Sequence, residues 1–184
     1  MTEIRDRQRY EAVYARTYTD LVRFVVRRGC PSDQAEDVVA EAFAVAWRRL
    51  ADLPGDSGEA RAWLFGIARR LLVAKQRADT RGHELSVRIA GQVAVEGPAL
   101  AHDDLVATSV DLVQAWNRLT PAHQEALSLS VWEGLTGAQA AQVLGISPLA
   151  FRIRLSRARR VLMRNLVAAD SGRLPMTSKG GSVR

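Results

Sequence analysis

The stretch TGAQAAQVLGISPLAFRIRLSRARRVLMRNL, residues 136–166, decides the fold of the C-terminal part of this chain. Small residues suited to a short helix run up to Gly145, and glycine is common directly after a helix end. Ser147 then stands where an N-cap is favoured, and Pro148 occupies the first position of the next helix. This order of short helix, tight turn and capped second helix is typical of a helix-turn-helix unit.

The second of these helices is predicted to bury one face and to present arginines elsewhere. Its apolar residues recur at helical spacing. They are Phe151, Leu155, Ala158, Leu162 and Leu166. Arg152, Arg154 and Arg157 are expected to lie away from the centre of that face, which suits a DNA major groove, where Arg binds guanine edges or phosphate. A solvated basic helix end is the alternative interpretation, because cations favour the last turn of a helix.

The charge of the chain also indicates a polyanionic partner. Its 184 residues carry a formal net charge of +6, and this length suffices for one ordinary domain or two small ones. The excess falls on residues 109–168, which hold seven Lys and Arg against three Asp and Glu. Nearly all the cations are arginines, which make planar, bidentate contacts with phosphate and bases.

The composition argues against several other kinds of site. Cys30 is the single cysteine, so it forms neither an intrachain disulfide nor a thiolate metal cluster, and we expect a structural role. His83, His102 and His123 lack metal-ligand spacing, and no phosphate-binding glycine loop or nucleophile elbow is present. We therefore expect no metal, no cofactor and no enzymatic activity. Without a signal peptide or an apolar run of about 18 residues, the chain is expected to be cytoplasmic and without membrane contact.

The N-terminal part is predicted to be a small helical domain, residues 1–80. Apolar residues recur at three- and four-residue spacing over three segments. These segments are residues 7–28, 35–47 and 59–77. Ser32 is expected to cap the second helix, and a Pro- and Gly-containing loop at residues 53–58 precedes the third.

A second small helical domain, residues 109–168, is predicted to contain the helix-turn-helix. Glycines interrupt the pattern over residues 81–108, which we expect to form a flexible linker. Further helices are predicted over residues 104–119 and 121–133, the latter capped by Thr120. The tail, residues 169–184, is expected to be disordered. The fold class predicted for the whole chain is all-α, with two domains.

Acidic residues gather along one edge of the second predicted helix. Asp33, Asp37 and Glu41 follow each other at four-residue spacing, and Glu36 lies among them. One interpretation is the general preference of carboxylates for helix N-termini. The other is a docking face for a basic partner, and the spacing alone leaves both open.

Two parts of the sequence resemble, in order, the second and fourth conserved regions of bacterial sigma factors. The class most similar is the small extracytoplasmic-function class, group IV of the sigma-70 family. The first part is DQAEDVVAEAFAVAWRRL (33–50) followed by ARAWLFGIARRLLVAKQR (60–77), and the second is LTPAHQEALSLSVWEGLTGAQAAQVLGISPLAFRIRLSRARRVLMRNL (119–166). The resemblance covers most of residues 10–166.

This resemblance implies a promoter-recognition subunit whose partners are core RNA polymerase and promoter DNA. It implies docking on the β′ coiled coil by the second helix and contact of the second domain with the β flap. The implied polymerase-binding residues are Asp33, Glu36, Asp37, Glu41 and Trp47. Many relatives are also held inactive by an anti-sigma protein, which is a further expected partner and would have to be a separate chain.

The resemblance also implies two DNA-binding surfaces. The minus-ten element would be recognised and melted by residues 53–60 and the helix after them, which fits the need for aromatic, polar and cationic groups to capture unstacked bases. The residues implied there are Arg61, Trp63, Arg69, Arg70, Lys75 and Arg77. The minus-thirty-five element would be read by the second helix of the helix-turn-helix. The residues implied there are Leu149, Arg152, Ile153, Arg154 and Arg157.

The sequence departs from the family pattern at several of these positions. Arg70, Ala74 and Ala40 replace the usual Asn, Asp and Gln, and Leu149 and Ile153 are apolar where small or polar residues are usual. These two side chains could contact thymine methyl groups or pack within the protein, and we expect packing. The promoter sequence is therefore not predicted.

The four tryptophans stand at helical spacing among apolar neighbours. Trp47, Trp116 and Trp132 are expected in the core. For Trp63, which follows the predicted base-reading loop, core packing and base contact both remain open.

Two other functions are compatible with parts of the sequence. An autonomous helix-turn-helix regulator would bind a palindromic site as a dimer without polymerase, but the two N-terminal motifs argue against it. A mimic that titrates a sigma factor's partner would have no need of the arginine-bearing helix.

Overall fold

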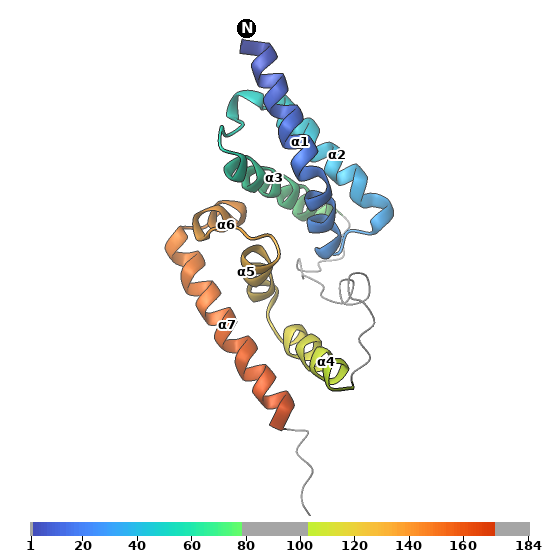
Figure 1. Cartoon of the computed structure of the whole chain (residues 1–184), viewed down its shortest axis with the longest axis vertical. Helices are drawn as coiled ribbons and strands as arrows, with labels where there is room; N and C mark the ends of the chain where they lie inside the picture. The colour runs from blue at the N-terminus through green and yellow to red at the C-terminus, as the bar shows by residue number, and fades with distance from the viewer. Residues whose placement is uncertain (1, 79–102, 172–184) are drawn as a thin grey trace, which may run out of the picture.

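The computed structural model describes residues 2–78 and 103–171, and over these ranges it contains only helices (Figure 1). The N-terminal helices are α1 (Thr2–Arg27), α2 (Ser32–Arg48), the 3₁₀ helix η1 (Leu50–Asp52) and α3 (Ser57–Ala78). The C-terminal helices are α4 (Asp103–Asn117), α5 (Pro121–Val131), α6 (Gly137–Leu144) and α7 (Pro148–Ser171). The predicted all-α fold class is confirmed.

Most of the predicted linker and tail lies outside the described residues. Where the two overlap, the chain is helical, in agreement with the helix predicted over residues 104–119 but not with the expected disordered tail. Residues 103–108, expected to belong to the linker, begin α4, and residues 169–171, expected to belong to the tail, end α7.

Helices α1, α2 and α3 form a three-helix bundle in which each helix packs on the other two. Their apolar stripes meet in a core that includes Leu21, Val39 and Leu64, all fully buried. The rings of Phe24 on α1 and Phe65 on α3 stack with centroids 4.6 Å apart. The predicted helical periodicity therefore identified buried positions on all three helices.

The start of α2 differs from the prediction that Ser32 is its cap. Pro31 is the N-cap residue, in an extended conformation and without a side-chain cap bond, and Ser32 is already helical. The Gln34 backbone N–H donates to the Pro31 carbonyl at 3.0 Å, so a backbone hydrogen bond closes the first turn. At α3, the Asp56 carboxylate instead accepts a hydrogen bond from the Glu59 backbone N–H at 2.9 Å.

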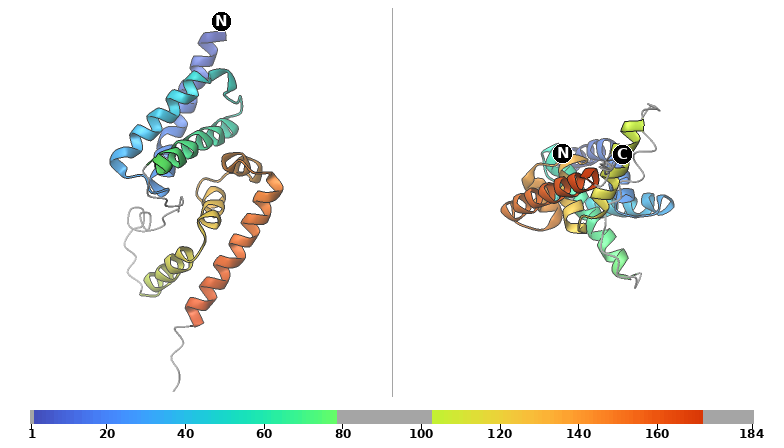
Figure 2. Two further views of the ribbon diagram at one scale, coloured as in Figure 1. Left: turned by 180° about the vertical axis from the view of Figure 1, so that it is seen from behind. Right: turned by 90° about the horizontal axis from the view of Figure 1, so that it is seen from below.

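In the C-terminal half, α7 runs alongside α4, α5 and α6 and packs on all three (Figures 1 and 2). Trp116, Leu119, Leu127 and Ala158 form a buried cluster among these helices. The helix-turn-helix is confirmed in detail. Ser147 Oγ accepts a hydrogen bond from the Ala150 backbone N–H at 3.1 Å, and α7 begins at Pro148.

Gly145 occupies the turn between α6 and α7 in a left-handed conformation, with φ +67°. A non-glycine residue adopts this conformation only at a cost. Upstream, the predicted cap of α5 is also confirmed, because Thr120 Oγ1 accepts from the His123 backbone N–H at 3.3 Å.

The two halves of the chain pack against each other through α3 and α6 (Figure 1). One apolar cluster contains buried residues of both halves, among them Phe65 and Ile67 on α3 and Ala140 and Val143 on α6. A Cβ atom added at Gly66 would lie 3.8 Å from the Val143 Cα, so a small residue at position 66 allows this close approach. The predicted domains therefore share a core across an interdomain interface.

Candidate functional site

The outward face of α7 presents cations around two exposed apolar side chains. Arg152 and Arg157 are exposed and Arg154 is half-buried, and none of the three forms an ion pair within the described chain. Leu149 is 55% exposed and Ile153 is 43% exposed. The expectation that Leu149 and Ile153 pack within the protein is therefore wrong, because they project opposite the buried Phe151.

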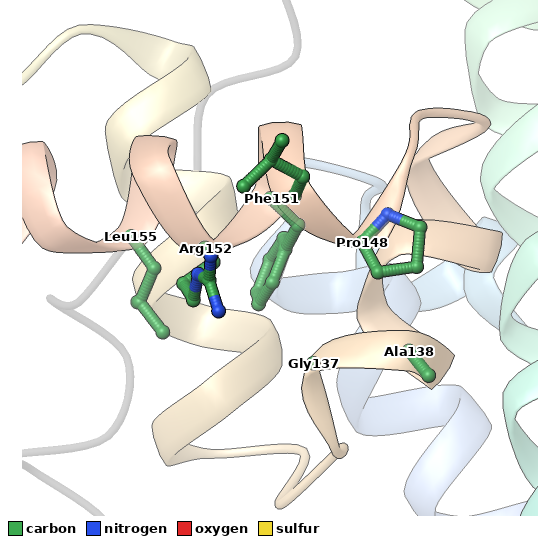
Figure 3. Close-up of a pocket in the computed structure, with 7 residues that line it drawn as sticks. Gly137, Ala138, Pro148, Phe151, Arg152 and Leu155 are labelled. Carbon is green, nitrogen blue, oxygen red and sulfur yellow. The ribbon is translucent and has the colours of Figure 1, made fainter.

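The first turns of α7 and the start of α6 enclose a shallow hollow of about 330 Å³. Figure 3 shows Phe151, Arg152 and Leu155 on α7 above Gly137 and Ala138 on α6. Phe151 is buried and anchors α7 on the helix before it. This packing leaves Leu149 at the edge of the hollow and Ile153 beyond it, both exposed to a partner.

The acidic edge of α2 is exposed. Asp33, Glu36, Asp37 and Glu41 are all exposed, and none forms an ion pair with another described residue. Trp47 continues this surface with 48% of its area exposed, so its expected place in the core is wrong. Its ring stands edge-on to Tyr10 with centroids 5.0 Å apart, which holds the indole at the surface.

The six residues predicted to bind the minus-ten element separate into two groups on α3. Arg70, Lys75 and Arg77 are exposed, and Lys75 Nζ donates to Gln34 Oε1 at 2.6 Å. Arg61 and Arg69 instead contact the C-terminal half. Trp63 is only 8% exposed, which answers the open question of its position in favour of the core in this arrangement.

The loop before α3 borders a second hollow of about 290 Å³. Arg9 and Arg16 from α1 and Arg61 from α3 line it, together with Gly55 of the loop and Ser57 at the start of α3. Arg9 Nη2 donates to the Leu53 carbonyl at 2.9 Å and ties the loop to α1. Arg61 is paired with Asp20 at 3.0 Å and Arg9 lies 4.0 Å from Asp6, so Arg16 is the lining arginine best placed to pair with an anionic ligand.

A cluster of charged groups crosses the interdomain interface, and the sequence pattern did not predict it. Arg69 Nε and Nη2 donate to the two carboxylate oxygens of Glu125 at 2.6 and 3.1 Å. Arg27 Nη1 donates to Glu133 Oε1 at 3.0 Å. Arg61 Nη1 donates to the Glu133 carbonyl at 2.6 Å, and its Nη2 lies 3.0 Å from Asp20 Oδ2.

Arg28 lies at the centre of this cluster and is fully buried. Its Nη1 donates to the Phe24 carbonyl at 3.1 Å and to Glu133 Oε1 at 3.4 Å, and its Nη2 donates to Ser128 Oγ at 3.1 Å. Its Cζ lies 3.5 Å from the centroid of the Phe24 ring. Burial lowers the pKa of Arg28 to about 10, while Glu133 and Glu125 act in the opposite direction.

A signal for this cluster was present in the sequence. The second predicted domain is basic, yet it holds Glu125 and Glu133, and the first helix ends in the adjacent pair Arg27 and Arg28. A single guanidinium removed from water requires a carboxylate partner. The pairing itself joins residues more than 100 positions apart, which a local pattern does not specify.

Both halves of the chain match known protein families. Residues 13–82 match the family described as Sigma-70 region 2, and residues 109–162 match Sigma-70, region 4. The RNA polymerase sigma factor CnrH of Cupriavidus metallidurans is 31% identical over 156 residues, which cover 78% of each chain. The chain is an RNA polymerase sigma factor of the sigma-70 family.

A second relative agrees with this membership, and a solved structure agrees with the fold. The ECF RNA polymerase sigma factor SigL of Mycobacterium tuberculosis is 29% identical over 155 residues, covering 82% of this chain and 85% of SigL. A solved structure of the sigma factor RpoE in complex with the anti-sigma factor NepR, from Bartonella quintana, has the same fold. Its TM-score is 0.60 at 24% identity, covering 86% of this chain and 96% of that chain.

This sigma factor thus directs transcription initiation, and nothing in the comparisons favours an autonomous regulator. The matched regions correspond to the two helical halves, α1–α3 and α4–α7. No helix in the described ranges is long and apolar enough to cross a bilayer.

Proposed function

We propose that this sigma factor recognises promoters through two surfaces on different halves of the chain. The N-terminal part of α7 enters the major groove of the minus-thirty-five element, with Arg152, Arg154 and Arg157 on guanine edges and phosphates. The observation that carries this assignment is the outward face of α7, because it is rigidly anchored, cationic and exposed.

The minus-ten element is assigned to α3 and the loop before it. Arg70, Lys75 and Arg77 are available for the strand backbone, and the arginine-lined hollow beside Gly55 fits an anionic strand. Arg61 and Arg69, which are bound to the C-terminal half here, join them once that half has left α3, whereas Trp63 is buried with its ring beside Arg49. Bond formation belongs to the polymerase, and we assign no catalytic step to this chain.

The acidic edge of α2 is assigned to the core polymerase. Four exposed carboxylates beside an exposed tryptophan form a surface complementary to a basic coiled coil, such as the one the family resemblance implies on β′. Rim charges of this kind accelerate association and are screened by salt. The second domain is assigned to the β flap, and we place the complex in the cytoplasm with its DNA.

A separate anti-sigma chain is proposed as the regulator. RpoE of Bartonella quintana shares the fold and is held in a complex with such a protein. The same exposed surfaces on α2 and α7 that serve polymerase and DNA are available for it here.

Run-off transcription from a genomic fragment library tests the proposal. Core polymerase with this protein is expected to start at a specific set of sites that core alone does not use. Asp37→Ala and Arg157→Ala should reduce those transcripts, whereas Arg164→Ala, the same charge change two turns further along α7, should not. Footprints made by the protein alone, without new start sites, would contradict the proposal.

A further inference from the structure

The centre of the outward face of α7 is apolar, which its cationic surroundings do not explain. Leu149 and Ile153 lie four residues apart, on the side of α7 opposite Phe151. Neither side chain belongs to an apolar cluster of the described residues. The fold therefore leaves both of them available to an external apolar group.

The charges around this pair favour DNA as the partner. Arg152 and Arg157 flank the two side chains, Arg160 follows them, and residues 148–160 contain no carboxylate. In the major groove, phosphates line the rim, and the apolar group offered by the bases is the 5-methyl group of thymine. A cationic rim with an apolar centre is thus complementary to a groove with thymine at its floor.

We infer that Leu149 and Ile153 determine the sequence preference of the upstream promoter element by packing on thymine methyl groups. This inference rests on the proposed function of α7. Each side chain selects an A·T pair at one position, while the flanking arginines hold phosphate or guanine.

Uracil substitution tests this contact, because deoxyuridine lacks only the methyl group of thymidine. Promoters found by run-off transcription are rebuilt with single dT-to-dU replacements across the upstream element and transcribed by the holoenzyme. At one or two positions, a single replacement should lower the rate of transcription initiation by about fourfold, which is the effect of one buried methyl group. Leu149→Ala and Ile153→Ala should each abolish sensitivity at one of these positions.

Met163→Ala is the matched control, because Met163 is 60% exposed on α7 but far from its first turns. It should retain the full uracil sensitivity. Start sites that are indifferent to uracil, or a sensitivity that survives in both alanine variants, would overturn this inference alone. A holoenzyme that starts no specific transcript would overturn the proposed function and this inference with it.

Discussion

Arg28 Nη1 and Glu133 Oε1 lie 3.4 Å apart, one from each half of the sigma factor, with 0% and 2% of their side-chain areas exposed. A guanidinium in such a position is desolvated on every side, and its lowered pKa of about 10 reflects that cost. Glu133, Glu125 and Ser128 supply the compensation, and all three come from α5 or the turn after it. The state of Arg28 is therefore coupled to the distance between the two halves.

Glu133→Ala removes the carboxylate shared by Arg27 and Arg28. In the closed arrangement of this structure, with the two halves packed together, the unpaired buried charge would cost about 3–5 kcal/mol. Separation of the two halves returns Arg28 to water, so we expect an increased radius of gyration in solution scattering and little change in the melting of the N-terminal bundle. Glu11→Ala, at an exposed pair with Arg7, is the control and should change neither quantity. A closed and equally stable Glu133→Ala chain would contradict the role of this pair.

Gly145→Ala should strain the turn of the helix-turn-helix. Position 145 requires a left-handed conformation, so alanine there should lower the free energy of unfolding by about 1 kcal/mol in urea denaturation. Gly137→Ala is the matched control, because a Cβ at that position meets Phe151 at an ordinary 3.8 Å. Equal stabilities of the two variants would show that the turn geometry is not required.

Arg157→Ala should reduce the salt dependence of promoter binding by the holoenzyme. Removing one phosphate-bound cation lowers the slope of log K against log salt by about 0.9. If Arg157 reads a guanine edge instead, affinity should fall by about 1–3 kcal/mol on the preferred sequence, with relaxed base selection at one position. Arg164→Ala should leave both the slope and the base selection unchanged.

Asp37→Ala should weaken binding to core polymerase without altering the fold. Asp37 is exposed on α2 and has no ion pair among the described residues, so its loss removes an intermolecular attraction and no internal one. A decrease of about two- to fivefold in affinity at low salt, disappearing at high salt, is the expected result of a rim charge. Fluorescence anisotropy of labelled protein titrated with core measures it, with Glu11→Ala again as the control.

Local sequence patterns predicted the helix-turn-helix down to single caps. Ser147, Thr120 and Gly145 occupy the predicted positions because caps and left-handed turns depend on a few adjacent residues. The prediction of Ser32 as a cap was wrong, because Pro31, which suits an extended conformation, occupies the N-cap position. Either of these adjacent residues could stand at the N-cap position, and the apolar spacing did not distinguish them.

Burial was harder to predict than helical structure. Periodicity shows that Trp47, Leu149 and Ile153 lie on helices, but it does not show whether an apolar side chain meets its own chain or a partner. All three are exposed in this sigma factor, on the surfaces assigned to polymerase and DNA. The interface between the halves was missed for a related reason, since Arg28 and Glu133 find each other through tertiary packing alone.

The absence of a side chain at Gly66 also bears on how this sigma factor can change over evolution. A residue larger than alanine has no room there while α6 keeps its place, since the atom of Val143 at contact distance is its Cα, which every residue at position 143 carries. Among descendants that keep this packing of α3 on α6, position 66 should therefore remain glycine or alanine. A lineage that acquires a bulky residue at 66 would lose the contact between the two halves through a single codon change.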